Sequence, residues 1–263
     1  MKKAEKTKRG IFKTGIAGFD KLFKRSGGIP EGNSVLVEGG PGSGKTNMCL
    51  QICHNACIQG KKALYMSFEE PEINLRLHME EFGWDPRVYE KKGNLMIKRF
   101  NALDIARSVE ALLSEAKKEL LIDIQPVLIP RDFEPDIVII DSLSAIASAF
   151  TGEDARFRIY MEQLFRYLEE HEITTFLIRE VSNPSHTGSV YTEKGEAVSF
   201  LSDGIIVVYN VLFEEGGRRE RAIEVLKMRG AEIDTRIVKA QLVNGKGFVI
   251  YPDKQLKGKY KLT

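Results

Sequence analysis

The sequence of 263 residues lacks three features that are typical of membrane proteins, of secreted proteins and of general nucleic-acid binders. No apolar run approaches the ~20 residues that a helix needs to span a bilayer. Residues 1–6 lead into no hydrophobic segment that would mark a secretory signal. The net charge is only +2, which does not indicate a global attraction to nucleic acid. We therefore expect a cytoplasmic protein without a membrane partner.

Cysteine is scarce, and all three cysteines fall within one predicted helix, at Cys49, Cys53 and Cys57. Their four-residue spacing places them along one stripe of that helix. A tetrahedral metal site usually draws its ligands from two segments, and a cytosolic chain without paired cysteines does not favour disulfides. We interpret the stripe as the buried face of the helix, where cysteine packs as a small hydrophobe. A metal site that includes the neighbouring His54 is the alternative.

The most informative motif is a glycine-rich loop that matches G-x-x-x-x-G-K-[ST]. It consists of Gly39, Gly40, Pro41, Gly42, Ser43, Gly44, Lys45 and Thr46, followed by Asn47. An apolar strand precedes it at 34–38, and a helix is predicted after it at 47–59. Glycines let the backbone wrap tightly with its N–H groups inward, and the helix N-terminus adds partial positive charge. Lys45 can reach the β- and γ-phosphates and Thr46 can ligate Mg²⁺, so the motif predicts a nucleoside triphosphate site.

Carboxylates end two of the predicted strands. Asp141 ends the apolar strand 136–141, where it is expected to hold Mg²⁺ together with Thr46. Glu69 and Glu70 end the strand 62–68, where a carboxylate can orient or deprotonate the water that attacks the γ-phosphate. The alternatives are a capping role for Asp141 and plain solvated charge for the two glutamates.

The order of elements predicts an α/β fold with a mostly parallel central sheet, flanking helices and an antiparallel C-terminal β extension. Helices are expected at 72–82, with Ile73, Leu77 and Phe82 on related faces, at 105–120, and at 153–171. Further strands are expected at 95–100 and 174–178, and hairpin strands between 205 and 251. We expect one domain at 13–252, with basic tails at 1–12 and 253–263.

Several further motifs occur in a fixed order around the loop. They are Thr14-Gly15-Ile16-x-Gly18-Phe19-Asp20, Gly28-Ile29-Pro30-x-Gly32, Ser67-Phe68-Glu69-Glu70, Phe82-Gly83-Trp84-Asp85, Asp141-Ser142, Ser202-Asp203 and Leu226-Lys227-Met228-Arg229-Gly230. Together they resemble the KaiC-like branch of RecA-type ATPases, above all its stand-alone single-domain archaeal members. The resemblance implies a RecA-like fold, ATP as the ligand, and ring-like homo-oligomers, expected to be hexamers, with nucleotide at the subunit interfaces.

The resemblance also implies a role for Lys227 and Arg229, the K-x-R motif of these proteins. It implies that the pair projects across a subunit interface onto the γ-phosphate bound by the neighbour, where cations stabilise the transition state. Their spacing on a strand predicts one shared face, continuing the face of Ile223 and Val225. The alternative is a sheet edge that is protected by charge.

Two departures from the family pattern limit the functions that can be inferred from the resemblance. The connection at 121–135 is longer than the family pattern, so no role is assigned to it. The chain holds one copy of the ATPase unit, so neither a double ring, nor autophosphorylation, nor circadian timing is inferred.

Three functions compete at this point. The first is an ATP hydrolase that acts as a nucleotide-dependent oligomeric switch in signalling or regulation. The second is a DNA-handling motor like RecA or RadA, with residues 182–199 as its nucleic-acid loop. That segment holds Lys194, His186 and Tyr191 but also Glu193 and Glu196, so it is not a basic track. The third is a regulatory protein that holds ATP with little turnover.

Overall fold

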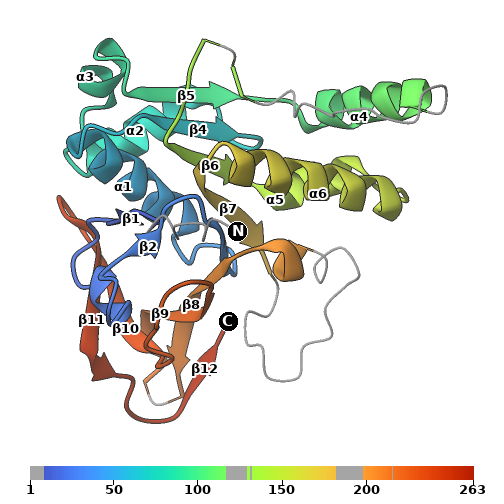
Figure 1. The fold of residues 1–263 in the computed structure, drawn as a ribbon. Helices are drawn as coiled ribbons and strands as arrows, with labels where there is room; N and C mark the ends of the chain where they lie inside the picture. The colour runs from blue at the N-terminus through green and yellow to red at the C-terminus, as the bar shows by residue number, and fades with distance from the viewer. Residues whose placement is uncertain (1–8, 117–128, 131, 182–197, 215) are drawn as a thin grey trace, which may run out of the picture.

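A ten-stranded sheet organises the part of the chain that the structure, a computed structural model, describes (Figure 1). The described residues are 9–116, 129–130, 132–181, 198–214 and 216–263. Most of the connection at 121–135 and of the segment 182–199, which would be the nucleic-acid loop of a DNA-handling motor, therefore lies outside them. The strands lie in the order β11-β10-β9-β8-β3-β7-β6-β4-β5, and β12 also pairs with β8.

The strand bounds follow the apolar runs of the sequence. They are β3 (Ser34–Gly39), β4 (Ala63–Ser67), β5 (Leu95–Arg99), β6 (Ile137–Asp141), β7 (Thr174–Glu180), β8 (Gly204–Phe213), β9 (Arg219–Met228), β10 (Val238–Val243), β11 (Gly247–Gln255) and β12 (Tyr260–Leu262). In the order of the sheet, neighbouring strands from β5 through β4, β6, β7 and β3 to β8 pair in parallel. The neighbours from β8 through β9 and β10 to β11 pair antiparallel. The predicted parallel sheet with an antiparallel C-terminal extension is confirmed. β1 (Ile11–Phe12) and β2 (Ile29–Pro30) pair antiparallel and form a separate two-stranded ribbon.

Helices cover both faces of the sheet (Figure 1). Each face has its own hydrophobic core. The helices are α1 (Lys45–Ile58), α2 (Glu72–Glu81), α3 (Pro86–Lys91), α4 (Ala102–Ala116), α5 (Leu143–Ala149) and α6 (Asp154–Glu170), with a 3₁₀ turn, η1, at Asp20–Leu22. One core contains α1, α2 and the β1–β2 ribbon, and the other contains α4, α5 and α6. The central strands, buried on both sides, read as continuous apolar runs for this reason.

The three cysteines pack into the core on the α1 side, so their interpretation as a buried helix face is confirmed. The expected apolar face of α2 is wrong for Ile73 and Leu77, whereas Phe82, just after the helix, packs into the core. Ile73 and Leu77 are 59% and 49% exposed, while Leu75 and Met79 are fully buried. Apolar residues lie on two sides of this helix, and its packing against α1 selects the side that periodicity alone did not.

The expectation of a basic tail at 253–263 is also wrong. β11 continues to Gln255, and β12 pairs with the C-terminal end of β8. There Tyr260 and Leu262 pack against the core. Their lysine neighbours alternate with them, as in a strand with one buried side. The composition of this segment is basic, but its pattern is that of a strand.

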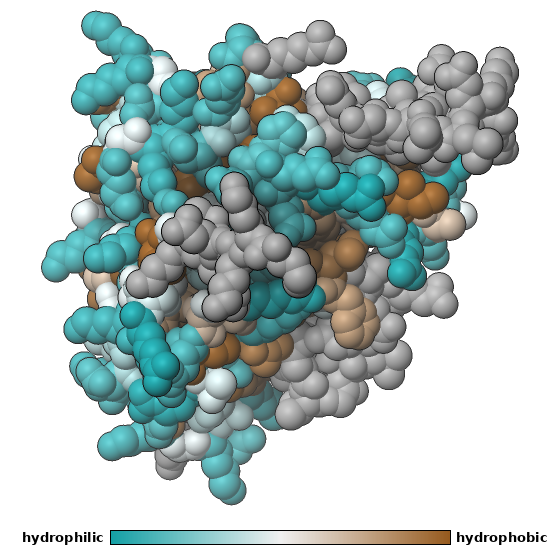
Figure 2. Space-filling model, in the orientation of Figure 1, coloured by the Kyte–Doolittle hydropathy of each residue, from teal (hydrophilic) through white to brown (hydrophobic). Residues whose placement is uncertain are grey.

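Hydrophilic residues cover most of the face shown in Figure 2, and hydrophobic residues appear there in small groups. No described helix combines the length and the apolar composition that a bilayer crossing requires.

Candidate functional site

The glycine-rich loop joins the carboxyl end of β3 to the first residue of α1. Gly44 is the N-cap of α1, with φ of +101°, and a Cβ there would lie 2.8 Å from Cζ of Phe248. At Gly39 a Cβ would lie 2.3 Å from the carbonyl oxygen of Val208. The left-handed backbone and the close approach of Phe248 therefore require glycine at position 44, and close approach alone requires it at position 39.

The antiparallel extension contacts the backbone of this loop. Arg221 on β9 donates from Nε to the carbonyl of Ser43 at 3.1 Å and from Nη2 to that of Gly42 at 3.3 Å. Asn210 on β8 donates to the carbonyl of Pro41 at 3.1 Å. Three consecutive carbonyls of the loop thus accept hydrogen bonds from side chains of the sheet, so they do not draw on the loop amides, although the N–H of Ser43 donates to the carbonyl of Gly40 at 3.3 Å.

Two buried polar groups of the loop fit a phosphate. Lys45 is 5% exposed, and its Nζ donates to the carbonyl of Gly40 at 2.9 Å and lies 3.7 Å from Oε1 of Glu180. Burial lowers the pKa of Lys45, and the nearby carboxylates oppose this shift. Ser43 Oγ is buried and has no hydrogen-bond partner among the described residues. A buried hydroxyl of this kind is the sort of group that a phosphate oxygen satisfies.

The hydroxyl of Thr46 donates to Oδ2 of Asp141 at 3.0 Å, and the Tyr65 hydroxyl donates to the same oxygen at 2.5 Å. Asp141 is 6% exposed, and burial raises its pKa to about 6. No cluster of three or more His, Cys, Asp and Glu side chains in the described ranges is placed to hold a metal ion. The hydroxyl and carboxylate fit Mg²⁺ as a partial ligand set, which phosphate and water would complete.

Glu69 and Glu70 lie beside this pair. Ser142, the N-cap of α5, donates its hydroxyl to Oε1 of Glu69, while Oε2 of Glu70 lies 3.7 Å from Nδ1 of His78. With the loop they line a cavity of about 240 Å³. The ends of β3, β4 and β6 therefore bring the predicted phosphate, metal and carboxylate residues together.

The same cavity contains residues that our sequence reasoning missed. Glu180 and Arg221 line it, and so does His78 on α2. Glu180 ends β7 as Asp141 ends β6, so its place at a strand end was a signal that could have found it. Arg221 has no local signal, because only the pairing of β9 with β8 places it beside the loop.

Lys227 and Arg229 lie at the other end of the sheet. β9 runs antiparallel to β8, which pairs in parallel with β3. Arg221 is therefore at the loop end of β9, and Lys227 pairs with Ile205 near the start of β8. Six residues of strand span roughly 20 Å. The structure does not bring these cations to the phosphate loop of their own chain.

The expected face of Lys227 is wrong because β9 contains a bulge. Ile205 pairs with Lys227, but Ile206 pairs with Val225, which leaves Leu226 as an extra residue. Ile223 and Val225 belong to the core on the α1 side, whereas Leu226 packs against the opposite core. The bulge breaks the alternation, so Lys227 does not continue the face of Ile223 and Val225.

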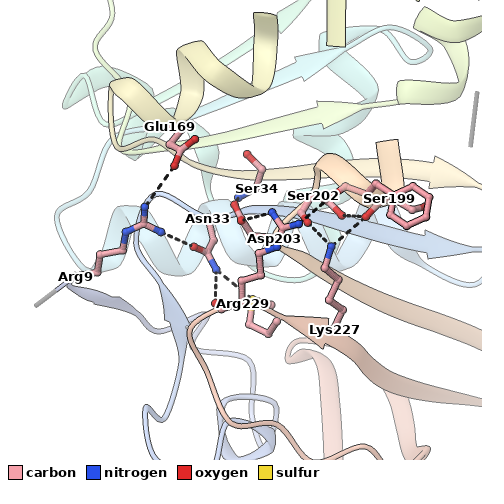
Figure 3. A network of polar contacts seen from close by, with 11 residues as sticks. Arg9, Asn33, Ser34, Glu169, Ser199, Ser202, Asp203, Lys227 and Arg229 are labelled. Carbon is pink, nitrogen blue, oxygen red and sulfur yellow. Dashed lines mark hydrogen bonds and ion pairs between the residues drawn. The ribbon is translucent and has the colours of Figure 1, made fainter. Parts of the chain in front are cut away.

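Lys227 and Arg229 nevertheless contact one common segment (Figure 3). Nζ of Lys227 donates to the carbonyls of Ser199 at 3.1 Å and Ser202 at 2.6 Å. Arg229 donates to the carbonyl of Phe200 at 3.0 Å and to Oδ1 of Asp203 at 3.3 Å.

Comparisons with known proteins show the family and the fold that this chain shares with them. The model of the family described as "ATPase: KaiC" matches residues 12–255. UPF0273 protein PH0284 of Pyrococcus horikoshii is 33% identical over 252 residues, which cover 93% of this chain and 95% of that protein. Circadian clock protein KaiC3 of Synechocystis sp. is 30% identical, over 91% of this chain and 45% of its own length. The solved structure of the KaiC-like protein PH0186 from Pyrococcus horikoshii superimposes with a TM-score of 0.72 at 27% identity, and covers 93% of this chain and 100% of that one.

Proposed function

Because the chain belongs to the KaiC family of ATPases, we propose that it binds ATP with Mg²⁺, hydrolyses it, and acts in the cytoplasm as a nucleotide-dependent oligomeric switch in signalling or regulation. One observation carries this proposal. A single cavity gathers a buried lysine on a glycine-rich loop, a threonine–aspartate pair and two glutamates at strand ends.

Each group has a distinct task in the proposed reaction. The loop amides and Lys45 bind the β- and γ-phosphates, and Thr46 and Asp141 would hold Mg²⁺, which offsets the charge of the phosphates when bound. Glu69 and Glu70 orient the attacking water and accept its proton. The hydrogen bond from Ser142 fixes the carboxylate of Glu69, so this base is positioned before the substrate arrives.

The distance between the phosphate loop and the two distal cations supports an oligomer. Lys227 and Arg229 lie roughly 20 Å of strand away from their own loop, so they can act on a γ-phosphate only if another subunit presents it. A surface that joins the cation end of one subunit to the loop end of the next is head-to-tail, and such contacts form a ring when the rotation between subunits closes and a filament when it does not. We propose a homo-oligomeric ring, a hexamer, with ATP at each interface.

Steady-state phosphate release and native mass measurement, each with and without ATP–Mg²⁺, test this function together. We expect turnover and a closed oligomer in the wild-type protein. A folded Lys45→Ala variant should lose high-affinity ATP binding and turnover. Unchanged ATP affinity in that variant, measured by calorimetry, would show that the site is wrongly assigned. ATP binding without phosphate release in the wild-type protein would favour a regulatory protein that only holds ATP.

A further inference from the structure

Residues 198–203, which we name the backing segment, hold the two distal cations. Besides the side-chain contacts, the backbone N–H of Arg229 donates to the carbonyl of Asp203 at 2.8 Å. Asp203 therefore contacts Arg229 through both its backbone and its carboxylate. The side chain of Arg229 is 57% exposed, and that of Asp203 is only 26% exposed. A half-exposed guanidinium is thus fixed on a better-buried carboxylate.

Asp203 is equally well tied to the strand that leads to the phosphate loop. Its Oδ2 accepts from the N–H of Ser34 at 3.1 Å, and its own N–H donates to the carbonyl of Ser34 at 2.8 Å. Ser34 is the first residue of β3, and the last residue of β3 is Gly39 of the loop. Figure 3 shows Asp203 between Ser34 and Arg229.

We propose that Asp203 is a positioning residue for ATP hydrolysis, which orients Arg229 toward the γ-phosphate bound by the neighbouring subunit. This inference rests on the proposed function, because it requires that Arg229 acts across an interface. It adds that Asp203 fixes the orientation of Arg229 relative to β3, the strand that carries the phosphate loop of the same subunit.

Charge and geometry both favour aspartate in this place. An arginine side chain is long and rotamer-rich, and it contributes to a transition state only when its planar fork is held in the right direction. Lys227 lies close enough that the charge of Arg229 helps burial to lower the pKa of Lys227, while the charge of Asp203 opposes this. The carboxylate therefore offsets the repulsion between two cations and fixes the position of one of them.

Loss of the charged hydrogen bond between Arg229 and Asp203 would misplace the guanidinium of Arg229. This change should lower turnover ~10–100-fold. Asp203→Asn keeps an oxygen that can accept from Ser34 but removes the charge that holds Arg229. ATP affinity should stay unchanged, because the phosphate loop of the same subunit is intact. Asp234→Asn is the matched control, since Asp234 pairs with the exposed Arg236 at 2.5 Å and is not part of the site.

Mixed oligomers separate positioning from a general effect on the fold. Chains with Lys45→Ala lack a working loop but carry Arg229, and chains with Arg229→Ala carry a working loop. Their mixture should recover activity at interfaces where the second chain meets the cations of the first. Adding Asp203→Asn to the Lys45→Ala chain should lower this recovered activity ~10–100-fold. Adding it to the Arg229→Ala chain should not, because that chain has no Arg229 to position.

The outcomes are distinct. If mixed oligomers form by native mass but the Lys45→Ala and Arg229→Ala mixture stays inactive at every ratio, action across the interface fails, whereas the proposed ATPase function itself fails only if the wild-type protein releases no phosphate. If that mixture is active but Asp203→Asn has the same effect in both chains, or none, only the positioning role fails. A rise in activity would show that Asp203 restrains Arg229 instead. Should Asp203→Asn not fold, Asp203→Glu keeps the charge and should retain more activity in the Lys45→Ala chain than Asp203→Ser.

Discussion

The two ends of β9 present a contrast. At the loop end, Arg221 contacts backbone carbonyls of a glycine-rich loop beside a nearly buried lysine. At the cation end, Lys227 and Arg229 are long side chains held against a short segment by its carbonyls and by Asp203. The loop end is built mainly from backbone conformation and buried groups, and the cation end from half-exposed side chains.

This contrast suggests that binding and hydrolysis have different physical requirements. A phosphate site needs a fixed backbone and desolvated donors, which one chain supplies by local folding. In our proposal, cations that act in the transition state are supplied by a separate surface, so that hydrolysis depends on assembly. Four changes, taken in order of decreasing effect, test this division.

The largest effect is expected from Arg229→Ala. An arginine supplied to the transferring phosphate is worth ~10³–10⁵ in rate, so turnover should fall by about this factor while calorimetric ATP affinity stays unchanged. Arg236→Ala, which removes an exposed arginine with its own aspartate partner, is the control and should leave turnover unchanged. If ATP affinity falls as much as turnover, the two ends do not have separate roles.

A smaller loss of rate is expected from replacing both Glu69 and Glu70 with Gln. The amides keep the size of the side chains but remove their basicity, and general-base catalysis contributes ~10²–10⁴-fold. Phosphate release should fall by that factor with ATP still bound. This result would show that, at the loop end, the glycine-rich loop binds ATP and the glutamates act in hydrolysis. Glu81→Gln, at an exposed position at the end of α2, provides the comparison. Equal losses of binding and turnover would contradict this role.

The third change tests whether backbone conformation governs the loop end. Gly42 and Gly44 both have positive φ, but a Cβ at Gly42 meets nothing within 4 Å, whereas one at Gly44 meets the ring of Phe248. Gly42→Ala should lower the free energy of unfolding by about 1–2 kcal/mol, and Gly44→Ala by a further ~1–3 kcal/mol. Urea denaturation measures both. Similar values for the two variants would show that the contact with Phe248 is unimportant.

The smallest effect concerns the helix behind the loop. His54 on α1 stacks on Trp84 with ring centroids 5.0 Å apart, and burial lowers its pKa to about 4 from an ordinary value of 6.5. Through His54 the unfolded chain therefore binds more protons between these values, so the His54 contribution to the free energy of unfolding should decrease as the pH falls from 6.5 to 4, while the raised pKa of Asp141 acts in the opposite direction. The partly solvated ring limits the His54 contribution to about 1 kcal/mol. His54→Gln should flatten this part of the pH dependence, and an unchanged slope would contradict the assignment.

Local patterns predicted the loop, metal and carboxylate residues of the loop end, but not Arg221, which only strand pairing places there. The glycine-rich loop, the apolar run before Asp141 and the glutamates after β4 are each readable within a few residues. Parallel strands then bring their carboxyl ends to one edge, which is why separate motifs converge in one cavity.

The cation end could not be derived in this way. Asp203 and Ser34 are 169 residues apart, and no local pattern indicates their contact. The bulge at Leu226 arises from the pairing of β9 with β8, so the alternation of β9 alone predicts the wrong face for Lys227. Likewise, the packing of α2 against α1 decides that Leu75 is buried and Ile73 exposed.

The buried cysteine stripe allows opening of the loop end to be observed chemically. Cys49, Cys53 and Cys57 are all the cysteines of the chain, and they lie on the helix whose first residues are Lys45 and Thr46. Burial raises the pKa of each thiol, that of Cys57 to about 12, so the native protein should react slowly with maleimides. Alkylation rates are thus an intrinsic reporter of α1 opening, without an engineered label, and saturating ATP–Mg²⁺ should slow them further.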